Sequence, residues 1–436
     1  MLSKILKREW VTIMNNVFDI SLNVLVDCVN EKKDFSLLIK EYTKNVKLNN
    51  YKKTCLSICG IVLRNYYLIK YFANHVLKFT DTRLVLATGI VFGTVAFKKV
   101  EDTSSCLEWY KNLLITNGIE YDEEKQKAIN ELIENKKNYN FTDLNKGSIQ
   151  YFSINNNLPI WFLKMLFKQY GRDIMFKVAR ECSKMPKQFA YKPTFFEYSD
   201  DEKVSLLDFD ELDKNFYIYK NEKSIKSVVA CHSNVLYPVQ QAEHKMALKL
   251  PQLQNKEVTI ILHSNENAYV ELIDKYISSN NVVEVLYSNP KRSLVPLVKI
   301  EKALNNLNFK YHETSDFTLE AYSKNKQDLI VYFAPSSNVD SFRRVPDYIL
   351  NFSQSSIDDL IKEQIDGLNE LAKYVEVNGK LVYCVPTIDI KETEVQVMKF
   401  LESNKNFVKE YTELFFPYEK DNSMYYYAIL KKSKIK

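Results

Sequence analysis

Glycine is scarce in this chain of 436 residues, which contains only 8. Only Gly367 and Gly379 follow Gly171. Glycine allows a backbone to approach a ligand closely, because it has no Cβ atom. The rest of the chain therefore has no glycine-rich loop of the kind that holds a nucleotide.

Cysteine and histidine show none of the spacings of a metal site. The 7 cysteines are odd in number and include no C-x-x-C pair, which argues against both a disulfide framework and structural zinc. The 5 histidines lack the i, i+4 pairing of a zinc helix. We expect reduced, buried cysteines and no bound metal.

Long hydrophobic runs are missing as well. The longest run, Leu84 to Phe97, is shorter than the roughly 18 to 20 residues that span a bilayer. It predicts a core helix. The first ten residues, "MLSKILKREW", contain no long apolar segment and no small-residue cleavage site. The expected protein is cytoplasmic, monomeric and without a membrane partner.

The composition is that of a folded protein. Hydrophobic residues make up 46% and charged residues 26% of the chain. The length suits about three domains of roughly 150 residues each. A net charge of +5 permits binding to RNA without requiring it.

The first two segments differ in pattern. From residue 1 to about 137 the apolar residues recur at helical spacing, which predicts an all-α domain over residues 1–145. A small α+β module is expected over 146–235. In it, Pro159 suits the first turn of a helix and Gly171 suits a helix end, and short strand-like pieces follow.

Strands and helices alternate in the remaining segment, residues 236–436. Apolar runs such as "VTIIL", "VVEVLY", "DLIVYF" and "KLVYCV" are separated by amphipathic helical stretches. This alternation predicts a mostly parallel, doubly wound α/β sheet. Two strand-like runs at the end, "FVKEYTELFF" and "MYYYAILKK", predict a closing antiparallel hairpin.

Three stretches resemble one known family. They are "LPIWFLKMLFKQYG", "APSSNVDSFRRVPD" and "GKLVYCVPTIDIKETEVQVMKFLESN". In order and spacing they are similar to segments of the bacterial ribosomal RNA cytosine-C5 methyltransferases of the Fmu/Sun (RsmB) family. "CLSICGIVLRNYYLIKYF" resembles the NusB-like helical domain of that family. The resemblance implies a NusB-like RNA-binding domain, a small RNA-binding module and a Rossmann-like class I methyltransferase domain.

The family's catalytic residues are missing at the matching positions. Its two cysteines, a nucleophile in Thr-Cys-Ser and a helper in Asp-Ala-Pro-Cys-Ser, fall on Pro386 and Ser336. Proline carries no nucleophile, and serine without an activating base is a poor substitute for a thiolate. Phe333 replaces the family's acidic residue that would bond the cytosine.

The family's S-adenosylmethionine site is changed too. Its Ala-Pro-Gly-Gly-Lys turn aligns with residues 265–269, "NENAY", where Glu266 and Tyr269 would crowd a ligand. Leu286 stands where an acidic residue bonds the cofactor ribose, and Asp316 is the remaining cofactor-binding candidate. We expect no cofactor, with Tyr269 and Phe333 as the candidates that fill the pocket.

Other candidates have roles in catalysis or RNA binding. Cys384, two residues before Pro386, is a candidate nucleophile, but two strand residues displace a side chain by about 6.6 Å, and a buried core position is the alternative. Arg343 and Arg344 are candidate phosphate contacts, with Asp347 orienting one of them. A salt bridge is the alternative. The RNA-binding candidates also include a basic pair, Lys291 and Arg292.

The preferred interpretation is a degenerate family member that no longer binds S-adenosylmethionine or transfers methyl groups. It would act on ribosomal RNA as an RNA-binding or ribosome-assembly factor. Two alternatives stay open: an active S-adenosylmethionine-dependent enzyme with divergent motifs, and a protein-interaction scaffold. Fold alone does not decide among them, because function depends on the site.

Overall fold

The structure is a computed structural model that describes residues 16–44, 49–100, 103–264, 266–288, 295–305, 308–314, 326–351, 354–419 and 423–434. The chain forms two compact units. Unit 1 comprises Met1–Ser183 and Phe342–Phe352, and unit 2 comprises Lys184–Ser341 and Ser353–Lys436.

Unit 1 is helical, as the sequence predicts. Its helices are α2 (Val17–Glu31), α3 (Phe35–Tyr42), α4 (Asn49–Arg64), α5 (Tyr66–His75), α6 (Thr82–Val95), α7 (Thr103–Thr116), α8 (Glu123–Asn135), α9 (Ile149–Asn156), α10 (Ile160–Cys182) and α16 (Tyr348–Asn351), with a 3₁₀ turn at Lys136–Asn138. Short polar residues begin several of them: the side chains of Asp34, Asp81, Asp122 and Ser148 accept hydrogen bonds from backbone N–H groups of the first turn.

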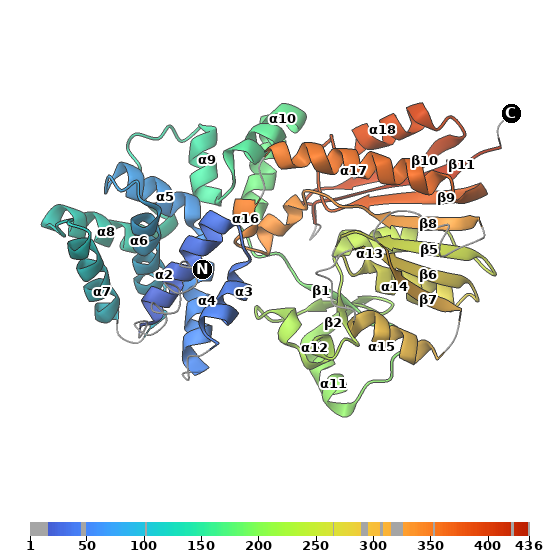
Figure 1. The fold of residues 1–436 in the computed structure, drawn as a ribbon, viewed down its shortest axis with the longest axis horizontal. Coiled ribbons are helices and arrows are strands. Elements are labelled where there is room, and N and C mark those ends of the chain that lie inside the picture. The colour runs from blue at the N-terminus through green and yellow to red at the C-terminus, as the bar shows by residue number, and fades with distance from the viewer. Residues whose placement is uncertain are drawn as a thin grey trace, which may run out of the picture. The chain divides into compact units, whose positions relative to one another are not determined.

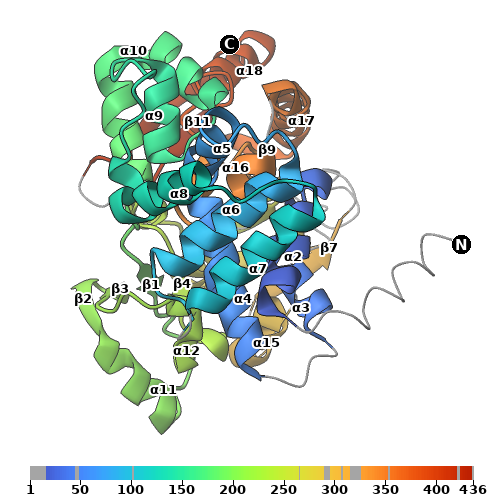
Figure 2. The same ribbon diagram turned by 90° about the vertical axis from the view of Figure 1, so that its left-hand side faces the viewer.

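The apolar run from Leu84 to Phe97 forms the core helix α6, which confirms that prediction. Its buried residues extend from Leu84 to Thr94. Helices α4, α6 and α7 lie side by side (Figure 2). A Cβ atom built on Gly89 would lie 2.9 Å from Cγ1 of Val62, so glycine permits the close approach of α4 and α6.

Helix α10 is bent at Gly171. This residue has φ 80° and ψ 178°, a conformation outside the helical region, and helical geometry resumes after it. The sequence signals at this point, Gly171 as a helix end and a second helix after it, agree with the bend. The helix begins directly after Pro159.

Unit 2 begins with a small antiparallel sheet of order β2-β3-β1-β4. Its elements are β1 (Phe189–Tyr191), α11 (Asp200–Ser205), β2 (Phe209–Asp213), β3 (Phe216–Tyr219), α12 (Val229–His232) and β4 (Tyr237–Pro238), with 3₁₀ turns at Leu206–Asp208 and Ile225–Ser227. The sequence indicated β1 and β3. The short strands β2 and β4 were not predicted, because β2 is exposed beyond Phe209 and β4 has two residues.

A seven-stranded sheet follows, with the order β10-β11-β9-β8-β5-β6-β7. Its elements are α13 (Gln241–Lys249), β5 (Glu257–Leu262), α14 (Ala268–Ile277), β6 (Val282–Tyr287), α15 (Val295–Leu304), β7 (Phe309–Glu313), β8 (Gln327–Phe333), α17 (Gln354–Ala372), β9 (Val375–Val385), α18 (Glu394–Ser403), β10 (Phe407–Phe415) and β11 (Tyr425–Lys432), with a 3₁₀ turn at Val339–Arg343.

The predicted Rossmann-like sheet and its closing hairpin are confirmed. Strands β5 to β9 pair in parallel, while β11 pairs antiparallel with both β9 and β10. Strand β7 was missed, since "FKYHE" is short, polar and placed at the edge of the sheet.

Helices cover both faces of the large sheet (Figure 1). Residues of α13, α14 and α15 share one buried cluster with Val258, Ile260 and Leu262 of β5 and with the small sheet. Residues of α17 and α18 share the other cluster with Ile261 of the same strand. The alternation along β5 follows from the two-residue period of a strand, and its apolar character on both faces is typical of parallel sheets.

The expected three-part division at residues 145 and 235 stays a prediction. In the structure, residues 146–183 pack with the helical unit, and the short segment 342–352 returns to it from unit 2. NusB-likeness of the helical unit also stays a prediction. Among the described residues no helix is long and apolar enough to span a membrane.

Candidate functional site at the carboxyl edge of the sheet

The candidate site lies where β5 and β8 end side by side. The chain leaves these strands in opposite directions along the sheet, which makes this edge its topological switch point. Ligands of open α/β sheets bind at such points. Here the N–H of His263 donates to the carbonyl oxygen of Phe333 at 3.0 Å, so backbone pairing continues past the end of β5.

The imidazole at this edge is a weak base. Burial lowers the pKa of His263 to about 4, and its ring lies edge-on to Tyr332 with 5.7 Å between centroids. A histidine with this pKa is neutral near pH 7 and holds a proton poorly.

Two aromatic side chains occupy the edge. Tyr269, at the start of α14, is 1% exposed, and Phe333, at the end of β8, is 0% exposed. Both belong to the buried cluster that packs against α13, α14 and α15. Their rings are therefore part of the hydrophobic core at this edge of the sheet.

The residues at this edge do not fit S-adenosylmethionine. Leu286, at the family's ribose-binding position, is buried in the apolar cluster on the other face of the sheet. Glu266, within the turn that the resemblance aligns with the family's glycine-rich loop, is also buried. Asn265 and Asp316 lie outside the described residues. Of the other positions that the resemblance aligns with the cofactor site, Glu266, Tyr269 and Leu286 hold large buried side chains, so no catalytic step through the cofactor is derived.

The positions of the family's cysteines hold side chains engaged in local structure. The Oγ atom of Ser336 accepts a hydrogen bond from the N–H of Asn338 at 3.2 Å, which stabilises the turn after β8. Pro386 is buried directly after β9. Neither position offers a thiol.

Cys384 is fully buried within β9. It is 0% exposed and belongs to the same core cluster as Phe333. Burial raises the pKa of its thiol well above the ordinary value. Because the thiolate is the reactive form of cysteine, this environment disfavours nucleophilic attack.

A buried carboxyl group connects the turns after β8 and β9, and the sequence did not reveal it. Glu392 accepts hydrogen bonds from the backbone N–H of Ser337 at 2.8 Å and from its hydroxyl at 2.5 Å. Gln364 of α17 donates at 3.1 Å to Oε2, the oxygen that also accepts from the N–H of Ser337, and the hydroxyl of Thr387 donates to Oε1 at 3.2 Å. The only signal in the sequence was the "ETE" stretch after β9.

This cluster has a structural role. Ser337 is 0% exposed and Glu392 is fully buried, so the pair is out of reach of an RNA base. Burial raises the pKa of Glu392 to about 7. A carboxyl group with this pKa is partly protonated at neutral pH. This suits a buried position at which several polar groups form hydrogen bonds with the carboxyl group.

The segment that contains Arg343, Arg344 and Asp347 packs within unit 1. The carboxylate of Asp347 accepts a bond from the N–H of Phe35 at 3.3 Å, and Arg64 donates to the carbonyl of Arg344 at 3.4 Å. Asp347 and Arg343 are buried, and Arg344 is half-buried. Burial raises the pKa of Asp347.

Aromatic packing also holds this segment. The ring centroid of Phe342 lies 5.1 Å from that of Phe162 and 6.2 Å from that of Trp161, both on α10. The segment thus contributes to the core of unit 1. Contact of Arg343 or Arg344 with RNA stays a prediction.

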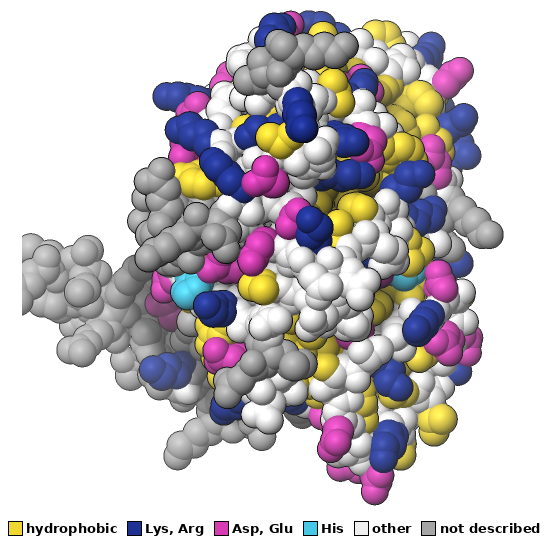
Figure 3. Space-filling view, turned by 90° about the vertical axis from the view of Figure 1, so that its right-hand side faces the viewer, with side chains coloured by type: hydrophobic (Ala, Val, Ile, Leu, Met, Phe, Trp, Pro, Cys, Tyr) yellow, Lys and Arg dark blue, Asp and Glu magenta, His cyan; other side chains and the backbone are white. Residues whose placement is uncertain are grey.

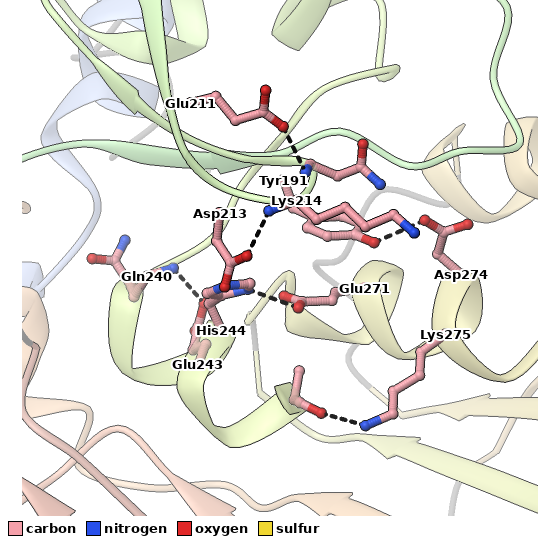
Figure 4. A network of polar contacts seen from close by, with 12 residues as sticks. Tyr191, Glu211, Asp213, Lys214, Gln240, Glu243, His244, Glu271, Asp274 and Lys275 are labelled. Atoms are coloured by element: carbon pink, nitrogen blue, oxygen red, sulfur yellow. Dashed lines mark hydrogen bonds and ion pairs between the residues drawn. The ribbon is translucent and has the colours of Figure 1, made fainter. Parts of the chain in front are cut away.

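A second polar network in unit 2 surrounds His244 (Figure 4). Its Nδ1 atom lies 2.7 Å from Glu271 of α14, and its Nε2 atom lies 3.6 Å from Asp213. The imidazole stacks on Phe216 with 3.9 Å between centroids. The network joins the β2–β3 turn to α13 and α14. Among the described residues no group of three or more side chains is arranged to hold a metal ion.

Asp274 also connects α14 to the small sheet (Figure 4). It accepts bonds from the hydroxyl of Tyr191 at 2.8 Å, the N–H of Thr194 at 3.0 Å and the hydroxyl of Thr194 at 2.5 Å. A buried carboxylate with three donors is well satisfied. The small sheet is therefore anchored to α14 by polar as well as apolar contacts.

Basic and acidic side chains are mixed on the face in Figure 3. Lys432, near the end of the chain, donates to the carbonyl oxygens of Ala372 and Val375. Lys291 and Arg292, both candidates for RNA contact, lie outside the described residues.

The fold is shared with proteins of known structure. PH0851 superposes with a TM-score of 0.69 and 14% identity over 95% of this chain and 98% of its own. A methyltransferase homologue from Pyrococcus horikoshii gives 0.50 and 13%, over 65% of this chain and 98% of its own. NSun6 from the same organism, solved with SFG, gives 0.51 and 11%, over 64% and 99%. At these identities the likeness shows a common fold.

Sequence comparison matches part of the chain to a known family. No curated protein sequence matches this chain. Residues 285–430 match the family of the 16S rRNA methyltransferase RsmB/F. The match extends from the end of β6 into β11 and so includes the turns with Ser336, Pro386 and Glu392. Through residues 285–430, this chain is similar to the RsmB/F family of 16S rRNA methyltransferases.

Proposed function

We propose that this protein is a family member that has lost methyl transfer and acts as an RNA-binding factor, with ribosomal RNA as its partner. The observation that carries the proposal is the packed carboxyl edge of the sheet. Tyr269 and Phe333 are core side chains at the point where a cofactor would bind.

The state of the thiols supports the same proposal. The two positions that match the family's cysteines hold Ser336 and Pro386, and the neighbouring thiol of Cys384 is buried with a raised pKa. A covalent attack on a cytosine needs an accessible thiolate. The turns after β8 and β9 lack the family's cysteines, and the buried hydrogen bonds of Glu392 give these turns a structural role.

The test is a pair of binding measurements on the full chain. S-adenosylmethionine is titrated calorimetrically up to millimolar concentration, with and without ribosomal RNA, and RNA binding is followed by fluorescence anisotropy. We expect salt-dependent RNA binding and no heat of cofactor binding. Saturable cofactor binding, followed by methyl transfer that a Cys384→Ala variant abolishes, would instead identify an enzyme.

A matched variant sharpens the cofactor measurement. Phe333→Asp restores the family's acidic residue at the end of β8. Because Phe333 is a core side chain, we expect this change to destabilise the protein without producing methyl transfer.

No detectable RNA affinity at low salt would exclude the RNA-binding proposal and favour a protein-interaction role.

A further inference from the structure

The first half of α10 has a basic face. Lys164 and Lys168 lie four residues apart, Arg172 follows directly after the bend at Gly171, and all three side chains are exposed. Lys164 and Lys168 lie on the same side of the helix, because residues four apart are about one turn from each other. Within the described part of the chain, none of the three forms an ion pair with an acidic side chain.

Exposed apolar side chains lie on the same side. Phe167 is 49% exposed and Ile160 is 40% exposed, although both are large hydrophobic residues. Their spacing relative to Lys164, at i−4 and i+3, places them beside it on the helix surface. An exposed aromatic ring among cations is the combination on which an unpaired base stacks.

Contacts hold Arg172 in place. The guanidinium carbon lies 5.1 Å from the ring centroid of Phe176. A Cβ atom built on Gly147 would be 3.3 Å from Nη2 of Arg172, so the guanidinium group lies against the turn that precedes α9. Lys146 in that turn is exposed and adds a further cation. Asp173, also exposed, is the acidic neighbour.

We propose that Lys164, Lys168 and Arg172, with Phe167 beside them, form a binding surface for the phosphate backbone and an unstacked base of single-stranded RNA. The inference rests on the RNA-binding function proposed above. Lysine supplies a point charge for phosphate, while arginine bonds phosphate oxygens through its planar group.

The experiment measures anisotropy of a labelled, short, mixed-sequence single-stranded RNA over a series of salt concentrations. The full-length variant Lys164→Gln/Lys168→Gln/Arg172→Gln is compared with the control Lys99→Gln/Lys111→Gln/Lys127→Gln. The control removes the same charge from exposed positions outside α9 and α10. Each lost phosphate contact should weaken binding roughly 5- to 10-fold at low salt and reduce the log–log salt slope by about 0.7.

Two further variants separate the contributions. Phe167→Ala should weaken binding about tenfold while leaving the salt slope unchanged, because stacking releases no counterions. The charge-conserving variant Lys164→Arg/Lys168→Arg/Arg172→Lys should bind nearly as the unmodified protein does. If it lost binding as the glutamine variant does, the charges would not be the cause.

The possible failures are distinguishable. If the unmodified protein binds RNA and the glutamine variant retains the affinity and salt slope of the control, this surface is excluded while RNA binding stands. If the unmodified protein binds no RNA at low salt, both proposals fail together. Thermal melting curves of all variants verify that they fold alike.

Discussion

The buried carboxyl group of Glu392 should make the stability of this protein depend on pH. Its pKa is raised to about 7 in the folded chain, from an ordinary 4.5. A carboxyl group with a raised pKa binds its proton more tightly in the folded state than in the unfolded state. Its contribution to stability is therefore fully present below about pH 4.5 and is lost as the pH rises to about 7.

The magnitude follows from the pKa difference. Each unit corresponds to about 1.4 kcal/mol, so the free energy of unfolding should fall by about 2 to 3 kcal/mol between pH 5 and pH 8 through this group. A Glu392→Gln variant removes the titration. Its amide can accept from the N–H of Ser337 with its oxygen and donate to the hydroxyls of Ser337 and Thr387 with its nitrogen.

The assay is urea unfolding of the unmodified protein and of Glu392→Gln at several pH values between 5 and 8. Because other buried carboxyl groups such as Glu271 also have a raised pKa, the difference between the two proteins is the measured quantity. Glu394→Gln, an exposed carboxyl group two residues away, is the control. If the difference in unfolding free energy between the two proteins did not change with pH, the raised pKa of Glu392 would be refuted.

Other outcomes follow from the contacts described above. In the native protein at pH 8, Cys384 should resist alkylation by iodoacetamide and label only after denaturation, while the half-buried Cys231 should label first, as peptide mass spectrometry would reveal. Asp274→Ala leaves three donors without their acceptor and should lower the free energy of unfolding by about 2 to 4 kcal/mol in urea unfolding. Gly89→Val should destabilise by about 1 to 3 kcal/mol in thermal melts, since α4 leaves no room for the side chain. Gly60→Ala is its control, because a Cβ atom there meets nothing within 4 Å, and it should be neutral or slightly stabilising.

Periodic patterns in the sequence predicted most of the fold. The helices of unit 1 and the alternating strands and helices of unit 2 were predicted from residue spacing, because a single buried face or two buried faces leave a regular trace in the sequence. The strands that escaped prediction are short: β2 and β7 have five residues each and are largely polar or exposed, and β4 has only two residues. Their existence depends on hydrogen bonds to a neighbouring strand rather than on their own composition.

The sequence by itself determined what this protein lacks: cysteines at Ser336 and Pro386, a glycine-rich turn before α14 and an acidic residue at Leu286. Residue identity is enough for such conclusions, since a missing functional group cannot be supplied by folding. Only the tertiary structure decided what the remaining side chains do. It packed Tyr269 and Phe333 into one core, brought Ser337 to Glu392 across 55 residues of chain, and placed the arginine-containing segment within the helical unit. These contacts join residues that are distant in sequence, and a local pattern does not show which distant side chains meet or how far their common surroundings shift a pKa.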